Sequence, residues 1–315
     1  MLYQENFQIA KTTYFRVGGK VDYYAEIESK RDLPELIAKI DNWSGLAKVV
    51  VGACSNILVS DNGFRGLVIK NKILGMDMAD GSWRVGAGEM IPIVAMRMAK
   101  NGWAGWERIA NIPGTVGGGI RGNVEAYEQS ISDCIEKVGW FDFSSQDTKY
   151  LEKEECQFEY RGSIFKNDLS GKGMIMEALF NLAKGDSTTL VKKIMDDRIR
   201  RKSVQPSGWS CGCFFKNIYL DEKNYQLLQN FLGKNHVLER KLGEYFSAGI
   251  LIDKVGLKGL KMGGAVVSDQ HANFILNAGE ALAIDIYNLY RKVQKEVYEQ
   301  TGIILENEVQ LVGDF

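Results

Sequence analysis

The stretch that most constrains the fold is glycine-rich and spans residues 112–127, IPGTVGGGIRGNVEAY. Pro113 and Gly114 predict a turn, and three consecutive glycines from Gly117 onward present backbone without side chains. Such a strip fits closely against a charged or flat ligand, such as a pyrophosphate or an aromatic ring system. A flexible surface loop is the alternative, but apolar residues recur within the stretch and would anchor it to a core.

A second glycine turn lies within residues 49–66, VVVGACSNILVSDNGFRG, where an apolar, strand-like run breaks at Gly52. Small residues after a strand let backbone N–H groups converge on phosphate oxygens, and Ser55 and Asn56 add side-chain donors. No G-K-S or G-K-T follows, so this is not the phosphate loop of a nucleoside triphosphatase. A plain tight turn is the alternative for this stretch alone. Together, the two glycine turns could share one extended dinucleotide, which predicts a bound cofactor.

A length of 315 residues predicts two or three domains. The composition, 45% hydrophobic and 25% charged, is typical of a soluble protein. A net charge of −1 argues against nucleic acid as a partner. No apolar run reaches the roughly 18 residues that cross a membrane, and the first residues lack the order of a secretion signal. Five scattered cysteines predict a reduced, cytoplasmic protein. With only His236 and His271 as histidines, we expect no metal site.

Periodicity and turn signals predict short strands in the first half, in the runs VDYYAEI, AKVVVGA, GLVIK and WRVGAG. A helix is expected from residue 91 to Gly102, and a second, charged helix over 187–206 is stopped by Pro206. This second helix would link the two halves of the chain.

In the second half, apolar residues at helical spacing predict a helix that ends at Gly302. Its buried face would consist of Leu282, Ile286, Leu289, Val293 and Val297. A strand is expected over 303–312, with Leu305, Val309 and Leu311 on one side and Glu306, Glu308 and Gln310 on the other. Residues 218–246 are expected to form a charged, helical insert.

Eight motifs occur along the chain in an order that resembles one enzyme family. They are TTYFRVGG, GACSN, IPGTVGGGIRGN, YRGSIFK, SCGCFFKN, SAGILID, LKGLKMGGAVVSDQHANFILN and LENEV. In this order they are similar to the UDP-N-acetylenolpyruvoylglucosamine reductases, FAD enzymes of bacterial cell-wall precursor synthesis. The resemblance implies an α+β fold whose FAD-binding region is of the vanillyl-alcohol-oxidase type. It implies FAD-binding subdomains at 1–71 and 72–203 and a substrate-binding domain at 204–315.

The resemblance also implies the reaction. Non-covalently bound FAD would take hydride from NADPH and pass it to the vinyl ether of enolpyruvyl-UDP-N-acetylglucosamine, forming UDP-N-acetylmuramate. NADPH and the UDP-sugar would be the only partners of a monomer. Arg161 and Cys213 are 52 positions apart and no tyrosine lies between them, which resembles the shorter form of the family, without a tyrosine-bearing loop.

Three residues match the family's catalytic positions. Arg161 would bind the substrate carboxylate with its planar guanidinium and hold the developing enolate charge. Glu308 would act near the same carboxylate, with Glu306 on the same strand face as the rival assignment. The matches imply Cys213 as the donor of the proton to the enolate carbon, where most members carry serine.

The stretch SGWSCGCFFKN holds two cysteines separated by one residue, so a metal site, a disulfide or a single proton donor are the three possible roles. A metal site would need further ligands, and none is suitably spaced. A disulfide between Cys211 and Cys213 would be strained. A free thiol has a pKa of about 8.5, well below that of a hydroxyl, so a cysteine can still donate. We therefore favour Cys213 as a proton donor and assign Cys211 no role.

The remaining implied roles are binding roles. The candidates for FAD contacts are Gly52, Ser55, Asn56, Gly114, Thr115, Gly117, Gly118 and Tyr160. Lys216 and Asn217 would bind the nucleotide end of the substrate, with stabilisation of a turn as their alternative. The family usually has glycines where this chain has Ala53 and Cys54, and Val124 and Glu125 would crowd the glycine loop. We expect His271 to have a structural role.

Two other functions compete with the reductase. A related FAD-linked alcohol or sugar oxidase would share the first half of the chain and use oxygen. A flavin-binding protein with impaired catalysis is suggested by Cys213 and the altered loops. The second half of the chain, with its motifs at Arg161 and Glu308, favours the reductase.

Overall fold

The computed structural model describes residues 1–42, 45–79, 81–233 and 240–315. The chain divides into two compact units, each built from three segments. Unit 1 comprises Met1–Phe7, Val21–Cys54 and Arg65–Ser203, and unit 2 comprises Gln8–Lys20, Ser55–Phe64 and Val204–Phe315. Both units mix helices with sheets, which confirms the predicted α+β class. The division into three domains stays a prediction.

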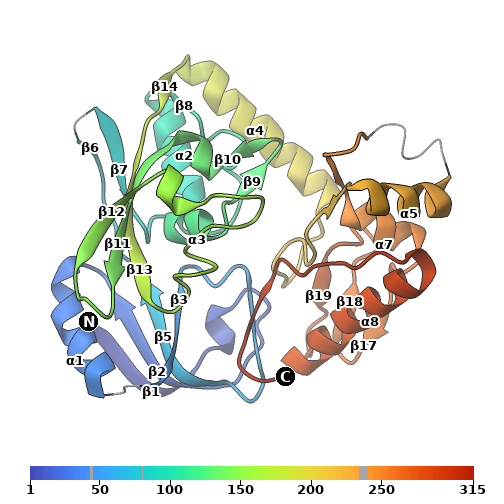
Figure 1. Cartoon of the computed structure of the whole chain (residues 1–315), viewed down its shortest axis with the longest axis horizontal. Helices are drawn as coiled ribbons and strands as arrows, with labels where there is room; N and C mark the ends of the chain where they lie inside the picture. Colours follow the sequence, from blue (N-terminus) through green and yellow to red (C-terminus); the bar gives the residue numbers. More distant parts are fainter. Residues whose placement is uncertain (43–44, 80, 234–239) are drawn as a thin grey trace. The chain divides into compact units, whose positions relative to one another are not determined.

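Unit 1 contains a four-stranded sheet in the order β1-β2-β5-β3, in which β3 and β5 run parallel (Figure 1). Its strands are β1 (Leu2–Gln8), β2 (Lys20–Ile27), β3 (Ala47–Val51) and β5 (Phe64–Asn71). Helix α1 (Leu33–Asn42) packs its apolar residues against this sheet, in a core that includes Leu36, Ile27 and Ile69. The strands predicted in VDYYAEI, AKVVVGA and GLVIK are therefore confirmed.

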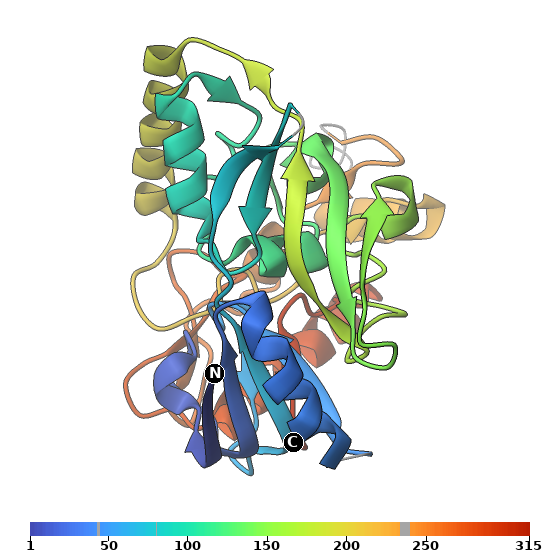
Figure 2. The same ribbon diagram turned by 90° about the vertical axis from the view of Figure 1, so that its left-hand side faces the viewer.

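The second sheet of unit 1 has five antiparallel strands in the order β12-β11-β13-β7-β6. They are β6 (Met76–Ala79), β7 (Ser82–Gly86), β11 (Ile135–Asp142), β12 (Thr148–Glu152) and β13 (Gly173–Phe180). A large core joins this sheet to α2 (Ile91–Lys100), α3 (Val116–Arg121) and α4 (Ser187–Val204). Helices α2 and α4 lie side by side (Figure 2). Two short antiparallel pairs complete the unit: β9 (Glu125–Ala126) with β10 (Gln129–Ser130), and β8 (Trp103–Ala104) with β14 (Ala183–Lys184).

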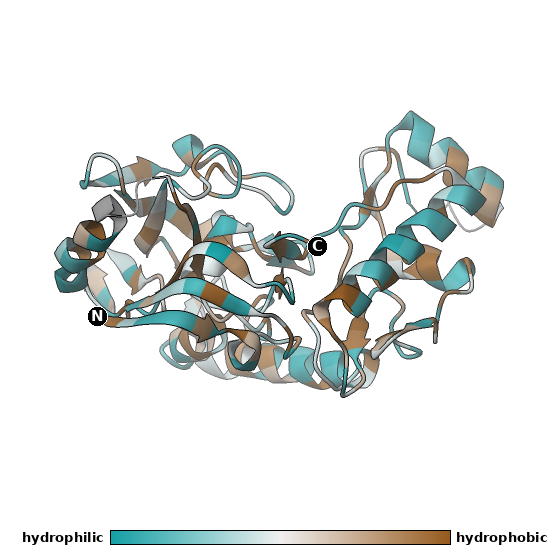
Figure 3. Ribbon diagram, turned by 90° about the horizontal axis from the view of Figure 1, so that it is seen from below, coloured by the Kyte–Doolittle hydropathy of each residue, from teal (hydrophilic) through white to brown (hydrophobic). Residues whose placement is uncertain are grey.

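Unit 2 is organised around the long helix α8 (Ala283–Thr301), which contacts a three-stranded sheet and α7 (Ala248–Lys254). That sheet consists of β17 (Lys261–Met262), β18 (Ala265–Val267) and β19 (Ile275–Asn277). Strands β4 (Ile57–Val59) and β20 (Gln310–Val312) run parallel to each other, although they are far apart in the sequence. The sides of the unit 2 helices that are visible in Figure 3 are largely hydrophilic. Short 3₁₀ helices occur at Ala10–Thr12, Lys30–Asp32, Ile131–Cys134 and Glu154–Cys156.

The three predicted helices form, and each ends where the turn signals indicate. Helix α2 is followed by Gly102 at φ 70°, and α8 is capped by Gly302 at φ 73°, both in the left-handed region that glycine favours. Helix α4 stops two residues before Pro206. One residue of the predicted buried face of α8 is wrong: Leu282 is the N-cap and is 56% exposed, because the helix begins after it.

The predicted strand over 303–312 is mostly wrong. Only Gln310–Val312 forms a strand, because only these residues find a partner strand, in β4. The preceding residues pair singly with the stretch that follows Cys213, as in the bridge between Phe215 and Asn307. The alternation also fails at its end, where Val312 is buried and Leu311 is only half-buried.

The predicted helical insert over 218–246 is only partly helical. It contains α5 (Glu222–Leu232), flanked by β15 (Ile218–Tyr219) and β16 (Tyr245–Phe246), which pair with each other. Residues 234–239, including His236, lie outside the described part of the chain.

A carboxylate from the N-terminal half of the sequence caps α8 within unit 2. The Asp61 side chain accepts the backbone N–H groups of Ala283 and Ile284, both at 2.9 Å. These N–H groups belong to the first helical turn and have no partner inside the helix. The segment around Asp61 is thereby held to a helix more than two hundred residues further along the chain.

We expect Asp61→Ala to destabilise the protein by about 1 kcal/mol, because two helix N–H groups lose their acceptor. Urea unfolding of the FAD-loaded protein measures this change. Glu280→Ala, at an exposed position near the same helix, serves as the control and should change the stability by less than about 0.5 kcal/mol. Equal stability of the Asp61 variant and the control would contradict the cap.

Candidate functional site

The two glycine turns found in the sequence meet inside unit 1. A Cβ on Gly52 would lie 2.0 Å from Oγ1 of Thr115 and 3.0 Å from its Cβ, far inside van der Waals contact. Gly52 follows β3, and Thr115 is the N-cap of α3. No other residue fits at Gly52 without moving the Thr115 side chain, so glycine is what allows the turns to touch. The two turns therefore touch, and the dinucleotide that they could share stays a prediction.

The stretch after Gly114 is a short helix, α3, which the sequence did not indicate. The N–H groups of Val116 and Gly117 donate to the carbonyls of Glu89 and Ala87, both at 2.8 Å, and that of Gly118 donates to Thr115 Oγ1 at 3.3 Å. A Cβ on Gly117 would lie 2.9 Å from the Cβ of Ala87. Glycines therefore let α3 pack tightly on β7 and the segment that leads to α2.

Gly118 differs from its neighbours because it is exposed. A Cβ there would meet only Thr115 Oγ1, at 3.4 Å, so the space in front of this backbone is open. Gly118 and the Gly52–Thr115 contact form a surface that a flat or anionic group can approach closely. We call Gly52, Gly114, Thr115, Gly117 and Gly118 the glycine cradle, and its role in binding a cofactor stays a prediction.

The turn after β3 continues into unit 2 at Ser55. Cys54 has a φ of 54°, in the left-handed region where glycine is favoured. Asn56 pairs with the other end of the chain: its Nδ2 donates to the Glu308 carbonyl at 3.3 Å, and its carbonyl accepts from Gln310 at 3.0 Å. Asn56 thus holds the segment that carries Glu308.

Arg161 lies in a tight turn of unit 1. Glu159 and Gly162 exchange backbone hydrogen bonds, both at 3.2 Å, and Nζ of Lys166 donates to the Arg161 carbonyl at 2.7 Å. Within this turn Arg161 has a φ of 57°, which costs a residue other than glycine roughly 1–2 kcal/mol. A strained backbone that is fixed by several contacts is common at functional positions. The guanidinium carbon lies 5.7 Å from the ring centre of Tyr160.

Cys213 belongs to a stretch of unit 2 that is fixed by Asn273. The Asn273 side chain, 2% exposed, accepts the N–H of Phe215 and donates to its carbonyl, both at 2.9 Å. The Asn273 carbonyl accepts the N–H of Phe214 at 2.7 Å. Since Phe214 and Phe215 are both buried, the half-buried Cys213 precedes a well-anchored segment.

Glu308 is held next to the same segment. Its N–H donates to the carbonyl of Phe214, the residue after Cys213, at 2.8 Å. Unit 2 therefore brings the segments of two predicted catalytic residues together, whereas the third, Arg161, belongs to unit 1. The rival residue Glu306 is 71% exposed and forms an ion pair with Lys216 at 3.1 Å. The choice between Glu308 and Glu306 as the catalytic carboxylate stays a prediction.

The two predicted substrate-binding residues have contacts within unit 2. Besides the ion pair of Lys216, Oδ1 of Asn217 accepts the N–H of Ala248, the first residue of α7, at 3.3 Å. Lys216 and Asn217 thus have contacts of the structural kind that we expected as the alternative to substrate binding. A role in binding substrate stays a prediction for both.

The described part of the chain holds all five cysteines, and none of them forms a disulfide: they are Cys54, Cys134, Cys156, Cys211 and Cys213. Burial raises the pKa of Cys134 to about 11 and that of Cys156 to about 12, so both stay protonated at neutral pH. Within the described residues, no group of three or more His, Cys, Asp or Glu side chains could hold a metal ion.

His271 has structural contacts, in agreement with its expected role. Its Nδ1 accepts the N–H of Asn273 at 3.3 Å, and its ring meets the edge of Phe274, with 4.8 Å between ring centres. Burial lowers the pKa of His271 below its usual value. The histidine therefore supports Asn273, which in turn fixes the Cys213 segment.

Sequence reasoning missed Arg121, at the end of α3. Burial lowers the pKa of this guanidinium, and no carboxylate in the described ranges lies within ion-pair distance. Its NH2 group donates to Ser170 Oγ at 3.4 Å. The signal that could have drawn attention to it is a cation inside an otherwise apolar, glycine-rich stretch.

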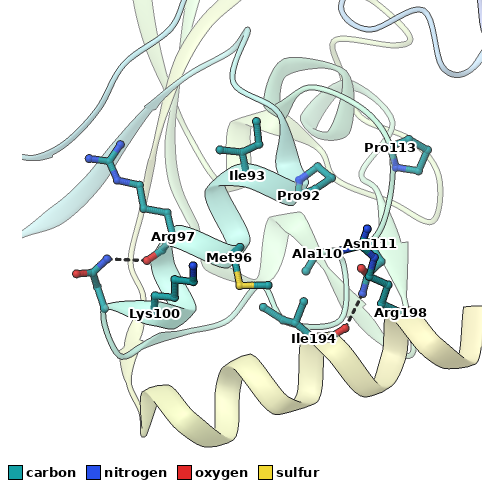
Figure 4. Close-up of a pocket in the computed structure, with 11 residues that line it drawn as sticks. Pro92, Ile93, Met96, Arg97, Lys100, Ala110, Asn111, Pro113, Ile194 and Arg198 are labelled. Carbon is teal, nitrogen blue, oxygen red and sulfur yellow. Dashed lines mark hydrogen bonds between the residues drawn. The ribbon is translucent and has the colours of Figure 1, made fainter.

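A hollow of about 660 Å³ lies between α2 and α4 in unit 1 (Figure 4). Apolar side chains such as Met96 and Ile194 line it together with the cations Arg97, Lys100 and Arg198. No predicted site residue is part of its lining, and we assign it no function. Among the described residues, no helix is long and apolar enough to span a membrane.

Comparison with known proteins agrees with this geometry. Residues 21–142 match a family described as an FAD binding domain. Residues 204–312 match the C-terminal domain of UDP-N-acetylenolpyruvoylglucosamine reductase. Together with the glycine cradle, these matches define an FAD-binding oxidoreductase with a second, dedicated domain.

Relatives cover almost the whole chain. The UDP-N-acetylenolpyruvoylglucosamine reductase of Carboxydothermus hydrogenoformans is 35% identical over 98% of this chain and 94% of its own length. The reductase of Synechococcus sp. is 35% identical over 99% of this chain and 92% of its own length. The crystal structure of the Thermus caldophilus enzyme is 27% identical, with a TM-score of 0.74 over 99% of this chain and 98% of that one. The chain belongs to the UDP-N-acetylenolpyruvoylglucosamine reductase family, which confirms the resemblance and the fold inferred from the sequence.

The left-handed conformation of Arg161 leads to a prediction about stability. We expect Arg161→Gly to be more stable than Arg161→Ala by about 1 kcal/mol, because only glycine adopts this φ without strain. Urea unfolding of both FAD-loaded variants measures the difference. At Lys192, inside α4, the order should reverse, since glycine costs a helix about 1 kcal/mol relative to alanine. The same order at both positions would argue against strain at Arg161.

The lowered pKa of His271 predicts a pH dependence of stability. The folded state favours neutral His271, whereas in the unfolded chain the imidazole binds a proton near its ordinary pKa of 6.5. Its contribution is therefore complete above pH 6.5 and is lost as the pH falls through the lower, folded-state pKa. Unfolding free energies at about pH 7.5 and about pH 5.5 should differ less in His271→Asn than in the unchanged protein. An unchanged pH difference would contradict this prediction.

Proposed function

We propose that this chain reduces UDP-N-acetyl-3-O-(1-carboxyvinyl)-glucosamine to UDP-N-acetylmuramate with NADPH, in the synthesis of peptidoglycan precursors. Support comes from family membership over nearly the full length and from the match of residues 204–312 to the reductase's own C-terminal domain. The structural observation that carries the proposal is the hydrogen bond from the Glu308 N–H to Phe214, next to Cys213. We also propose that the protein is a cytoplasmic monomer.

The residues of the glycine cradle fit FAD as a non-covalent cofactor. Its members are Gly52, Gly114, Thr115, Gly117 and Gly118, and the open space in front of the Gly118 backbone supports this proposal. The others that would hold it are Ser55, Asn56 and Tyr160. When bound, FAD supplies a carrier for the hydride that NADPH donates and the vinyl carbon of the substrate receives.

The side chains of the protein stabilise the negative charge on the substrate and supply a proton to it. Addition of hydride to the terminal vinyl carbon leaves an enolate next to the substrate carboxylate, and Arg161 stabilises this negative charge with its planar guanidinium. Glu308, protonated or hydrogen-bonded, binds the same carboxylate. The thiol of Cys213 gives its proton to the enolate carbon, and the resulting thiolate regains one from solvent. Lys216 and Asn217 bind the nucleotide part of the substrate.

The role of Cys213 is tested by measuring the two halves of the reaction separately under nitrogen. We expect Cys213→Ser to keep substantial turnover, because a hydroxyl also donates a proton. Cys213→Ala should lose several orders of magnitude in the step that consumes the enolpyruvyl substrate. The bleaching of the flavin by NADPH should be unchanged in both variants. Normal substrate turnover by the alanine variant would exclude Cys213 as the donor.

The same experiment on the unchanged protein separates the competing functions. A reductase is bleached by NADPH and regains its colour when the enolpyruvyl substrate is added without oxygen. Colour that returns only with oxygen would indicate an oxidase instead. Bleaching without any return of colour would indicate a flavin-binding protein with impaired catalysis.

A further inference from the structure

We infer that Ser163 is a positioning residue that holds the Arg161 turn against the end of α3, a role that rests on the proposed function of Arg161. Ser163 is fully buried, and its Oγ donates to the carbonyl of Arg121 at 2.7 Å. Arg121 is the last residue of α3, where carbonyl groups have no partner inside the helix. The hydroxyl therefore satisfies a helix end and fixes the turn two residues after Arg161.

A second buried contact holds the other side of the same turn. Asn123, 6% exposed, donates from Nδ2 to the carbonyl of Glu159 at 2.9 Å. Asn123 follows α3 closely and has a φ of 43°, which asparagine tolerates better than most residues. The turn from Glu159 to Gly162 is thus attached on both sides to the C-terminal end of one helix.

Helix α3, which receives these two hydrogen bonds, also carries part of the glycine cradle. Its N-cap is Thr115, which touches Gly52, and Gly118 lies in its first turn. With six residues, α3 is about 9 Å long, so it is a short and direct connection. The two hydrogen bonds therefore set the position of Arg161 relative to the cradle inside unit 1.

The Arg161 backbone needs support from its surroundings. It is left-handed, a conformation that the free chain would avoid, so contacts with neighbouring elements have to hold it. Without the Ser163 hydroxyl, the carbonyl of Arg121 would lose this donor, and the turn would lose one of the two side-chain hydrogen bonds that attach it to the end of α3. The guanidinium would then spend less time where the substrate carboxylate needs it, and small misplacements of this kind slow reactions strongly.

The test uses Ser163→Ala in the FAD-loaded enzyme, with both half-reactions followed under nitrogen. We expect the step that consumes the enolpyruvyl substrate to slow by about 10- to 100-fold. Bleaching by NADPH should stay within about twofold, since Arg161 acts only on the substrate carboxylate. Ser170→Ala is the matched control, because Ser170 also contacts Arg121 but through its exposed side chain, and it should react at the normal rate.

A double-mutant comparison separates positioning from general support of the fold. Arg161→Lys alone should slow the substrate step, and adding Ser163→Ala should slow it by less than about threefold more, because the positioned fork is already lost. A full, multiplicative effect would overturn the inference, and so would a normal rate in Ser163→Ala. A normal rate in Arg161→Lys would instead contradict the proposed role of Arg161 itself.

Asn123→Gly provides an independent variant, because glycine keeps the left-handed backbone and removes only the amide donor. We expect the same selective slowing of the substrate step. If both Ser163→Ala and Asn123→Gly lose FAD or fail to fold, the inference is overturned as well. The two contacts would then support the unit as a whole and not Arg161 in particular.

Discussion

The contact between Gly52 and Thr115 is the constraint on which the first unit depends. It joins the end of β3 in the four-stranded sheet to the start of α3 on the five-stranded sheet, and it exists only because Gly52 has no side chain. From Thr115 onward, α3 is fixed by hydrogen bonds to Glu89 and Ala87. The surface that we propose for the cofactor therefore arises from close packing of backbone, and not from a set of flexible glycines.

In unit 2, a buried amide side chain fixes the backbone that follows Cys213. Asn273 uses both its side-chain oxygen and nitrogen on Phe215, so the segment after Cys213 has a fixed register without belonging to a regular sheet. The strand-like stretch with Glu308 then adds to its other side through Phe214. The side chains that we propose as catalytic in unit 2, those of Cys213 and Glu308, thus belong to irregular segments whose backbones are fixed by hydrogen bonds. His271, which supports Asn273, is part of the same arrangement.

The sequence was informative wherever the decisive contacts are local. Helix ends at Gly102 and Gly302 were predictable because left-handed glycine terminates helices in most contexts. Helix α3 was not predictable, because three glycines oppose a helix and packing against residues such as Ala87 and Ile91 has to outweigh that cost. The strand over 303–312 failed because alternation cannot tell which residues find a partner strand. Motifs located Arg161, Cys213 and Glu308, but the bond from Ser163 to Arg121 joins residues too distant in sequence for any pattern to predict.

The parallel pairing of β4 with β20 has a consequence for how the protein can be divided. A fragment that starts at Val204 would carry β20 without its neighbour and α8 without the carboxylate of Asp61. During synthesis on the ribosome, the segments 8–20 and 55–64 emerge long before the residues they pack with. The second unit is therefore completed only when the end of the chain has been made, and expression of its last segment alone should give an unfolded product.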